Sequence, residues 1–272
     1  MDSRLLSKTI AIVIPTYNER ANITTLIPQI KQATKDIIYP SLDGELATTD
    51  IGNSVHIVVV DDSSSDGTGD RVLSLSRKDN NIHLIKRPGK MGLGSAYKDA
   101  FEWINNNLNC EIIIQMDADL SHPPGLLRKM IEPLAAGSAD VIIASRYVGK
   151  GGIRGWPMHR RMISKCANWL TKLILGVKVN DTTSGYRAYN ISTVRDLLSE
   201  NFSSRGYEYQ IEVLYILSRL NKKIEELPFT FANRIEGKSK LEIKDIMHFA
   251  YTVFKLRFLG STRSHNLSLI TL

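Results

Sequence analysis

Short apolar runs, each followed by polar or acidic residues, alternate with stretches of helical pattern through the first 150 residues of this 272-residue chain. Apolar runs of this length, bounded by turn signals, indicate buried strands. Strands that alternate with helices usually pair in parallel, so the pattern predicts an α/β fold with a mostly parallel central sheet and helices on both faces. The five predicted strands span residues 10–14, 55–60, 82–86, 112–116 and 140–145.

Acidic side chains follow three of these predicted strands. Glu19 follows the first, Asp62 the second, and Asp117 and Asp119 the fourth. The carboxyl ends of parallel strands meet at one edge of the sheet, where ligands bind. Paired carboxylates suit Mg²⁺ or Mn²⁺ holding substrate phosphates, so we predict a nucleotide site with the cation at Asp119 and the base or ribose at Asp62. The alternative is that each carboxylate only caps a helix or faces solvent.

The charge and the cysteines narrow the class of protein. Lys and Arg number 35 against 28 Asp and Glu, and the net charge of +7 favours nucleic acid, phosphorylated substrates or an anionic membrane surface. We expect no nucleic acid, because aromatic residues are not interleaved with the basic ones. Cys110 and Cys166 match no metal-binding spacing, which favours a reducing, cytosolic setting. No signal peptide or membrane span is expected, unless the chain is cut before a segment that residues 267–272 would begin.

Several familiar motifs are missing. No Gly-x-Gly-x-x-Gly follows the first predicted strand, and Gly92-Leu93-Gly94 is interpreted as the start of a helix. The phosphate-binding P-loop motif would need a glycine where Ala232 stands. His122 is expected to support its loop rather than to bind a metal.

After residue 152 the strand–helix alternation gives way to two amphipathic helices, predicted over residues 156–175 and 243–258. We consider two interpretations of each helix. Either it lies on a bilayer with its apolar face down and its basic residues on head groups, or that face completes the core. A polar insertion at residues 36–53 is assigned no role.

Taken in order, the motifs at residues 15–20, 60–68 and 117–124 resemble the family 2 glycosyltransferases, which have the Rossmann-like GT-A fold. Later motifs narrow the resemblance to the dolichol-phosphate mannosyltransferases without transmembrane segments. These motifs are Ser145-Arg146-Tyr147, Trp156-Pro157, Ser184-Gly185-Tyr186-Arg187 and Arg234-x-x-Gly237-x-Ser239-Lys240-Leu241. The resemblance covers about residues 8–258.

The resemblance implies a single GT-A catalytic domain over residues 1–272. Its nucleotide-sugar half would span about residues 8–150 and its acceptor or lipid-facing half about 151–260, with C-terminal amphipathic helices and a tail at 261–272. By the same resemblance, the guanine-nucleotide part of GDP-mannose would contact Pro15, Tyr17, Glu19, Val60 and Asp62.

The remaining site residues also come from the resemblance. Asp117, Ala118 and Asp119 would contact the sugar-nucleotide, and Asp119 would be the main ligand and a catalytic residue. Asp117 and Ser121 would complete the protein ligands of Mg²⁺ or Mn²⁺, although many relatives carry glutamine where Ser121 stands.

Basic residues would hold the phosphates of both substrates. Arg146, Arg234 and Lys240 would bind the donor, and a loop over residues 234–241 would close on donor and metal. Arg146, which would also be catalytic, and Arg160 would bind the acceptor phosphate.

The implied activity is metal-dependent, inverting transfer of mannose from GDP-mannose to dolichyl (polyprenyl) phosphate, giving dolichyl β-D-mannosyl phosphate for glycan assembly. The implied location is peripheral, on the cytoplasmic side of the ER membrane in a eukaryote or of the plasma membrane in an archaeon. The resemblance also allows for a small membrane-embedded partner subunit. Two alternatives stay open: another donor, UDP-glucose or UDP-GlcNAc, with the same lipid, and a non-catalytic binding protein on this scaffold.

Overall fold

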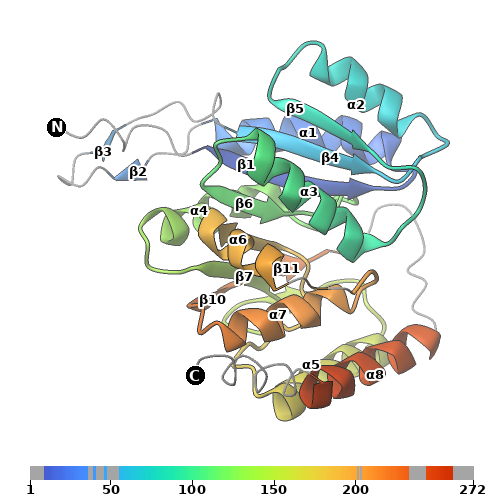
Figure 1. The fold of residues 1–272 in the computed structure, drawn as a ribbon, viewed down its shortest axis with the longest axis vertical. Helices are drawn as coiled ribbons and strands as arrows, with labels where there is room; N and C mark the ends of the chain where they lie inside the picture. Colours follow the sequence, from blue (N-terminus) through green and yellow to red (C-terminus); the bar gives the residue numbers. More distant parts are fainter. Residues whose placement is uncertain are drawn as a thin grey trace, which may run out of the picture.

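The computed structural model describes residues 9–35, 39–40, 46–47, 55–200, 202, 204–232 and 243–259; for 39–40, 46–47, 243–246 and 259 it describes the backbone alone. A seven-stranded sheet forms the centre of the molecule, in the order β10-β7-β9-β6-β1-β4-β5 (Figure 1). Only β9 runs antiparallel to its neighbours, which confirms the predicted mostly parallel sheet. The strands are β1 (Ile10–Thr16), β4 (Val55–Asp61), β5 (Ile82–Lys86), β6 (Ile112–Gln115), β7 (Val141–Ser145), β9 (Arg187–Asn190) and β10 (Ile224–Pro228).

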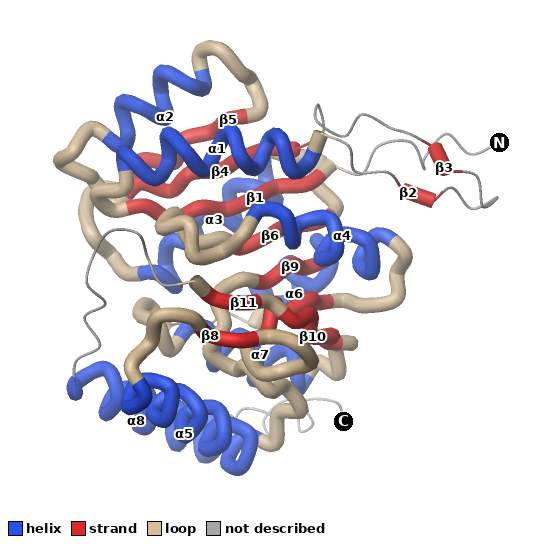
Figure 2. The backbone as a smooth tube through the Cα atoms, turned by 180° about the vertical axis from the view of Figure 1, so that it is seen from behind, coloured by secondary structure: helices blue, strands red, loops and turns tan. Residues whose placement is uncertain are grey.

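Helices cover both faces of the sheet (Figure 2). Side chains alternate between the two sides of each strand, so a buried strand adds apolar side chains to both faces. Ile10, Ile12 and Ile14 of β1 belong to one apolar cluster, and Ala11 and Val13 belong to the other. The first cluster includes residues of α1 (Arg20–Thr34), α2 (Thr68–Ser76) and α4 (Leu127–Ala135), and a 3₁₀ turn (Pro124–Leu126) precedes α4. The second includes residues of α3 (Leu93–Asn107), α6 (Ile191–Ser199) and α7 (Tyr209–Arg219).

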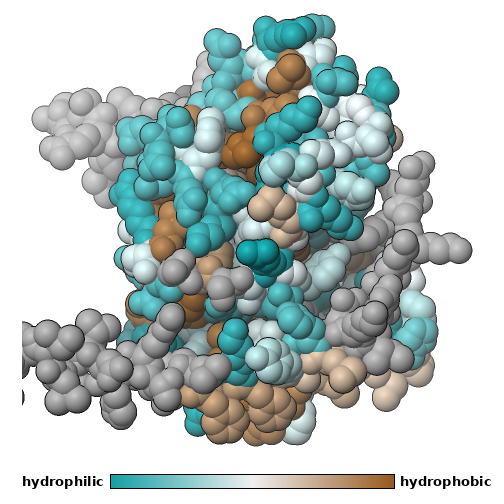
Figure 3. Space-filling model, turned by 45° about the vertical axis from the view of Figure 1, so that its right-hand side comes forward, coloured by the Kyte–Doolittle hydropathy of each residue, from teal (hydrophilic) through white to brown (hydrophobic). Residues whose placement is uncertain are grey.

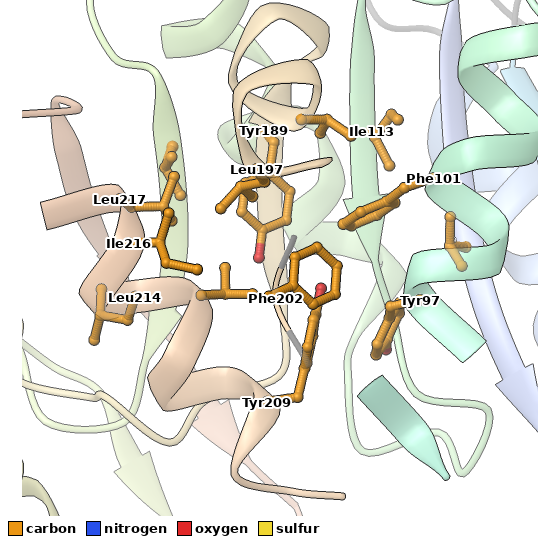
Figure 4. Packing of buried hydrophobic residues seen from close by; sticks show 14 of the residues in the cluster. Tyr97, Phe101, Ile113, Tyr189, Leu197, Phe202, Tyr209, Leu214, Ile216 and Leu217 are labelled. Atoms are coloured by element: carbon orange, nitrogen blue, oxygen red, sulfur yellow. The ribbon is translucent and has the colours of Figure 1, made fainter. Parts of the chain in front are cut away.

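Aromatic rings fill the second cluster where α3 meets the start of α7 (Figure 4). Tyr97 and Tyr209 stack with ring centroids 5.6 Å apart, and the Phe202 ring lies 5.3 Å from Tyr209. Gly94 permits this approach, since a Cβ there would lie 2.7 Å from the Tyr209 Cβ and 2.2 Å from the Ser204 carbonyl oxygen. As predicted, Gly92-Leu93-Gly94 starts a helix.

Helix α1 begins at Arg20, directly after Glu19, and Asn22 lies inside the helix and donates to the Glu19 carboxylate at 2.5 Å. Strand β10 ends at Pro228, and β11 (Thr230–Phe231), just beyond it, pairs with β8 (Gly152–Ile153) instead of the central sheet. Strand β9 was not predicted. In the insertion, β2 (Tyr39–Pro40) and β3 (Leu46–Ala47) form an antiparallel pair.

The helices α5 (Met158–Leu175) and α8 (Ile243–Leu259) pack side by side at one end of the molecule (Figures 1 and 2). α5 buries the polar Asn168 and Thr171, while Met162, Trp169 and Leu173 are each more than 60% exposed. For these three side chains, the interpretation that the apolar face completes the core is wrong. None of the helices in the described part of the chain has the length and apolar character of a membrane span.

A histidine pair near the amino ends of β4 and β5 gives a prediction about stability. His56 Nδ1 and His83 Nε2 lie 2.9 Å apart, and burial lowers the pKa of both rings; the charge of His56 lowers that of His83 further. Both pKa values are lower in the folded than in the unfolded protein. The neutral pair therefore contributes to the free energy of unfolding above the unfolded-state pKa of about 6.5, and this contribution is lost as the pH falls through the folded-state pKa values.

We therefore expect the melting temperature to drop between pH 7 and pH 5. The double variant His56→Gln/His83→Gln should lose part of that dependence, as measured by calorimetry across the same buffers. Identical pH profiles for the two proteins would contradict this account.

Candidate active site

The carboxyl ends of β1, β4 and β6 meet at one edge of the sheet, as predicted. The Asp62 amide donates to the Thr16 carbonyl at 3.0 Å, which ties the ends of β4 and β1 together. Just past these three strands, Asn18, Ser63 and Leu120 have φ angles of 59°, 56° and 62°, in the left-handed region. Such conformations are costly for residues other than glycine and concentrate at functional sites. The loops at this edge are therefore held in specific, locally unfavourable shapes.

The two aspartates after β6 occupy different environments. Asp119 is 7% exposed, and its Oδ1 accepts hydrogen bonds from the Ser121 amide at 3.1 Å and the Ser121 hydroxyl at 2.5 Å. The Asp117 side chain is about one third exposed, and the Asp117 amide donates to the buried His122 at 3.0 Å. His122 stacks on Tyr186 and, as expected, supports the loop.

The oxygens of this loop are of the chemical type that a hard divalent cation takes as ligands. Within the described ranges, no group of three or more His, Cys, Asp or Glu side chains could enclose a metal. Two carboxylates and a neighbouring hydroxyl are the protein ligands typical of a cation whose other positions are filled by water and substrate phosphates. The residues that would hold it are Asp117, Asp119 and Ser121.

Asp62 pairs with Arg87, a residue that the sequence analysis did not identify. Arg87 Nη1 donates to Asp62 Oδ1 at 2.7 Å, and the Met91 amide donates to Asp62 Oδ2 at 3.3 Å. Burial raises the pKa of Asp62, although the charge of Arg87 acts to lower it. Arg87 directly follows β5, so its place at the same sheet edge was the signal that could have found it.

The other predicted nucleotide contacts differ in how far a ligand can reach them. Tyr17 is 46% exposed, and the Lys90 ammonium lies 4.8 Å from its ring centroid. Pro15 is half-buried beside Val60, its partner in the β1–β4 pairing, whereas the Val60 and Ala118 side chains are buried. Val60 and Ala118 therefore offer a ligand little more than their backbone.

Arg146, just past β7, is held in place by the Asp181 carboxylate, which was not among the predicted site residues. Its Nε and Nη2 donate to the two Asp181 oxygens at 2.7 and 2.6 Å, and Nη2 also donates to the Thr183 hydroxyl at 2.8 Å. Burial alone would lower the pKa of Arg146, but the hydrogen bond and charge of Asp181 outweigh it and raise the pKa. The charge of Asp117 acts in the same direction.

The two arginines expected at the acceptor phosphate lie around one indole ring. The Arg160 guanidinium carbon is 3.8 Å and that of Arg146 is 5.4 Å from the Trp156 ring centroid. Arg146 also lines a pocket of about 280 Å³ together with Arg161 and Lys165. This side of the molecule is thus basic and aromatic. Arg234 and Lys240, with their loop, lie outside the described residues.

The family model described as "Glycosyl transferase family 2" matches residues 11–198. The chain belongs to this family. The prediction of a family 2 glycosyltransferase is therefore confirmed. The match ends in the last turn of α6, so α7 and the amphipathic helix α8 lie beyond it.

Relatives and solved structures agree with this assignment. The chain is 35% identical over 243 residues to a polyprenol monophosphomannose synthase of Mycolicibacterium smegmatis, covering 89% of this chain and 84% of the relative. It is 35% identical to an undecaprenyl-phosphate mannosyltransferase of Micrococcus luteus, covering 84% and 86%. Glucosyl-3-phosphoglycerate synthase of Mycobacterium tuberculosis, solved with Mn²⁺ and UDP, shares the fold with a TM-score of 0.62 at 18% identity, covering 92% and 80%. The predicted GT-A fold is confirmed.

The Asp62–Arg87 pair gives a prediction for stability. Arg87→Met would leave Asp62 buried without its ion-pair partner, and breaking one side of a buried pair costs about 3–5 kcal/mol. We expect the free energy of unfolding, measured by urea denaturation, to fall by about that amount. Lys86→Met is the matched control, because Lys86 is the preceding, exposed residue; its effect should stay within about 0.5 kcal/mol. Equal losses in the two variants would refute the role given to the pair.

Proposed function

We propose that this protein transfers mannose from GDP-mannose to a polyprenyl phosphate, such as dolichyl phosphate, with Mg²⁺ or Mn²⁺ at Asp117 and Asp119. The observation that carries the proposal is the 35% identity, over more than four fifths of the chain, to two relatives named as polyprenol- or undecaprenyl-phosphate mannosyl enzymes. GDP-mannose as the donor rests on the motif resemblance at residues 15–20 and 60–68.

The groups that would act on the donor lie at the carboxyl edge of the sheet. A bound cation supplies a Lewis acid for the negative charge that develops on the departing diphosphate. Asp119 is set for this task because Ser121 fixes one carboxylate oxygen from two sides. Tyr17, exposed at the end of β1, offers the nucleotide a ring surface backed by Lys90.

The acceptor side needs little proton transfer. A lipid phosphate has a second pKa of about 6, so near neutral pH its oxygen is already a nucleophile. A phosphate oxygen would form the new bond to the anomeric carbon while the bond from that carbon to the diphosphate breaks and GDP leaves. In-line attack inverts an α-linked donor into a β-linked product. Arg146 and Arg160, both close to the Trp156 ring, carry N–H groups that would orient the incoming phosphate.

The lipid must reach this site from a membrane, and the two C-terminal helices carry a surface suited to one. Its apolar side chains gather at the lower end of the molecule (Figure 3). They recur at helical spacing on each helix, and the neighbouring Lys165 and Lys172 on α5 are basic. This outer apolar face comprises Met158, Met162, Trp169, Leu173, Met247, Tyr251, Phe254 and Phe258.

The transfer reaction is tested with purified protein, GDP-mannose carrying a radiolabel in the sugar, and a polyprenyl phosphate. We expect labelled lipid with Mn²⁺ and none with EDTA. Asp119→Asn should lower kcat about a hundredfold or more, because it weakens the cation site. Asp70→Asn is the control, an exposed carboxylate on α2 whose loss should leave turnover unchanged. Preferential transfer from UDP-glucose or UDP-GlcNAc would overturn the donor assignment.

Membrane attachment is tested by flotation with vesicles of phosphatidylcholine, with and without phosphatidylglycerol. The protein should float with the anionic vesicles, less so at high salt, since the basic residues contribute electrostatically. Trp169→Ser/Phe254→Ser should reduce flotation. Leu73→Ser, on α2 and 43% exposed, is the matched control. Wild-type protein that stays in solution with anionic vesicles would refute the attachment.

A further inference from the structure

The indole of Trp156 lies against the two arginines that are expected to bind the acceptor phosphate. The Arg160 guanidinium lies over the ring, with its carbon 3.8 Å from the ring centroid, whereas that of Arg146 is 5.4 Å away. A separation of 3.8 Å is close to van der Waals contact, so Arg160 and Trp156 form a stacked cation–π pair. In the reaction proposed above the indole has no task of its own.

The two arginines are oriented in different ways. Arg146 is held at its edge, because its Nε and Nη2 donate to the Asp181 carboxylate, which also balances its charge. Arg160 meets Trp156 with the face of its guanidinium. Such a contact takes up no N–H group, since these groups lie in the plane of the guanidinium. An indole carries no net charge, so the contact sets the plane of Arg160 and does not neutralise its charge.

The backbone on both sides of Trp156 has a defined conformation. Gly155, directly before it, has a φ of 79°, in the left-handed region that residues with a side chain rarely adopt. Pro157, directly after it, precedes α5, and its carbonyl accepts from the Arg161 amide at 3.2 Å in the first turn of that helix. Arg160 is the third residue of α5. The turn and the helix start therefore bring the indole and the guanidinium together.

A second ring supports the indole. The Phe231 and Trp156 rings lie 5.3 Å apart at 64°, the edge-to-face arrangement that aromatic pairs favour. Phe231 belongs to β11, and its carbonyl accepts from the Arg154 amide at 2.8 Å, next to the pairing with β8. Phe231 also meets the buried ring of Phe229 edge-on, at 6.5 Å. Trp156 is thus connected to the core through two phenylalanines.

The plane of the guanidinium matters for holding a phosphate. Two parallel N–H···O bonds form only when the N–H edge of an arginine points at the phosphate oxygens. A long side chain on a helix surface loses rotamer freedom when it takes up that geometry, and a restraint present beforehand reduces this loss. Resting on the proposed function, we infer that Trp156 is a positioning residue, which holds Arg160 in the plane required by the phosphate of the acceptor lipid.

The first test measures kcat and KM for both substrates, with the polyprenyl phosphate dispersed in detergent so that attachment to a bilayer plays no part. Trp156→Leu removes the aromatic face. We expect its KM for polyprenyl phosphate to rise about five- to twentyfold, the size of a cation–π contact partly shielded from water. The KM for GDP-mannose and kcat should each stay within about twofold, because Asp181 still holds Arg146.

Two further variants show whether the aromatic face is what matters. Trp156→Phe keeps a ring and removes an indole N–H that has no partner among the described residues, so it should hold the acceptor KM within about threefold of wild type. Trp103→Leu is the matched control. Trp103, on α3, packs against His83, with ring centroids 5.1 Å apart, away from the carboxyl edge of the sheet. Its replacement should change neither KM.

A double-mutant cycle separates positioning from direct contact with the substrate. It compares kcat/KM at low acceptor concentration, which stays measurable when binding is weak. Because Trp156 acts through Arg160, Trp156→Leu should lower kcat/KM less than twofold in an Arg160→Met background, although it lowers that of wild type five- to twentyfold. Equal losses in the two backgrounds would show that the indole itself contacts substrate, and would overturn the inference.

The remaining outcomes distinguish the positioning role from the proposed function. A Trp156→Leu protein that unfolds, or that loses kcat/KM for both substrates alike, would show a structural role and overturn the inference. An acceptor KM equal to that of wild type would do the same. In each of these cases a wild-type protein that transfers mannose leaves the proposed function standing. Wild-type protein that transfers no mannose to polyprenyl phosphate would overturn both.

Discussion

The architecture of the site depends on one buried positive charge, the guanidinium of Arg187. Arg187 is completely buried and donates to three carbonyl oxygens, those of Thr182, Ser184 and Gln210. An unpaired charge in the interior is very costly, so these acceptors have to stay in place for the fold to tolerate it. The guanidinium thereby joins β9, the turn before it and the start of α7. The aromatic layer of Tyr97, Tyr189 and Tyr209 packs around this joint.

Buried charges at the sheet edge are matched in pairs. Asp62 is balanced by Arg87, and Arg146 by Asp181. Each pair fixes the orientation of the side chain that would meet a substrate. A phosphate entering beside Arg146 would meet the Nη1 N–H groups, because Nε and Nη2 already donate to Asp181 and Thr183. Such pre-orientation favours stabilisation of charge that appears during the reaction.

The alternation of apolar runs and helices was enough to predict the parallel part of the fold. The predicted strands over residues 10–14 and 55–60 lie within β1 and β4, and the carboxylates at 19, 62, 117 and 119 were correctly placed after strand ends. This succeeded because burial on both faces makes central strands continuously apolar.

What the sequence did not predict depends on partners far away in the chain. β9 is four residues long and contains an arginine, so only its pairing with β6 and β7 makes it a strand. Arg87 and Asp181 gain their roles from carboxylates and guanidiniums 25 and 35 positions away. The outward-facing side of α5 could not be assigned either, because the helix buries Asn168, whose Oδ1 accepts from Thr182, and exposes Trp169. Local pattern does not contain that information.

The position of β9 also has a consequence for how the molecule can be assembled. β7 pairs only with β9 and β10 in the central sheet, and both come from the last third of the chain. A ribosome that has released only the first 150 residues would present β6 and β7 with the space between them unfilled. The first 150 residues therefore have a gap between β6 and β7 until β9 is inserted there. Cutting the chain at that point would yield two fragments that need each other to complete the sheet.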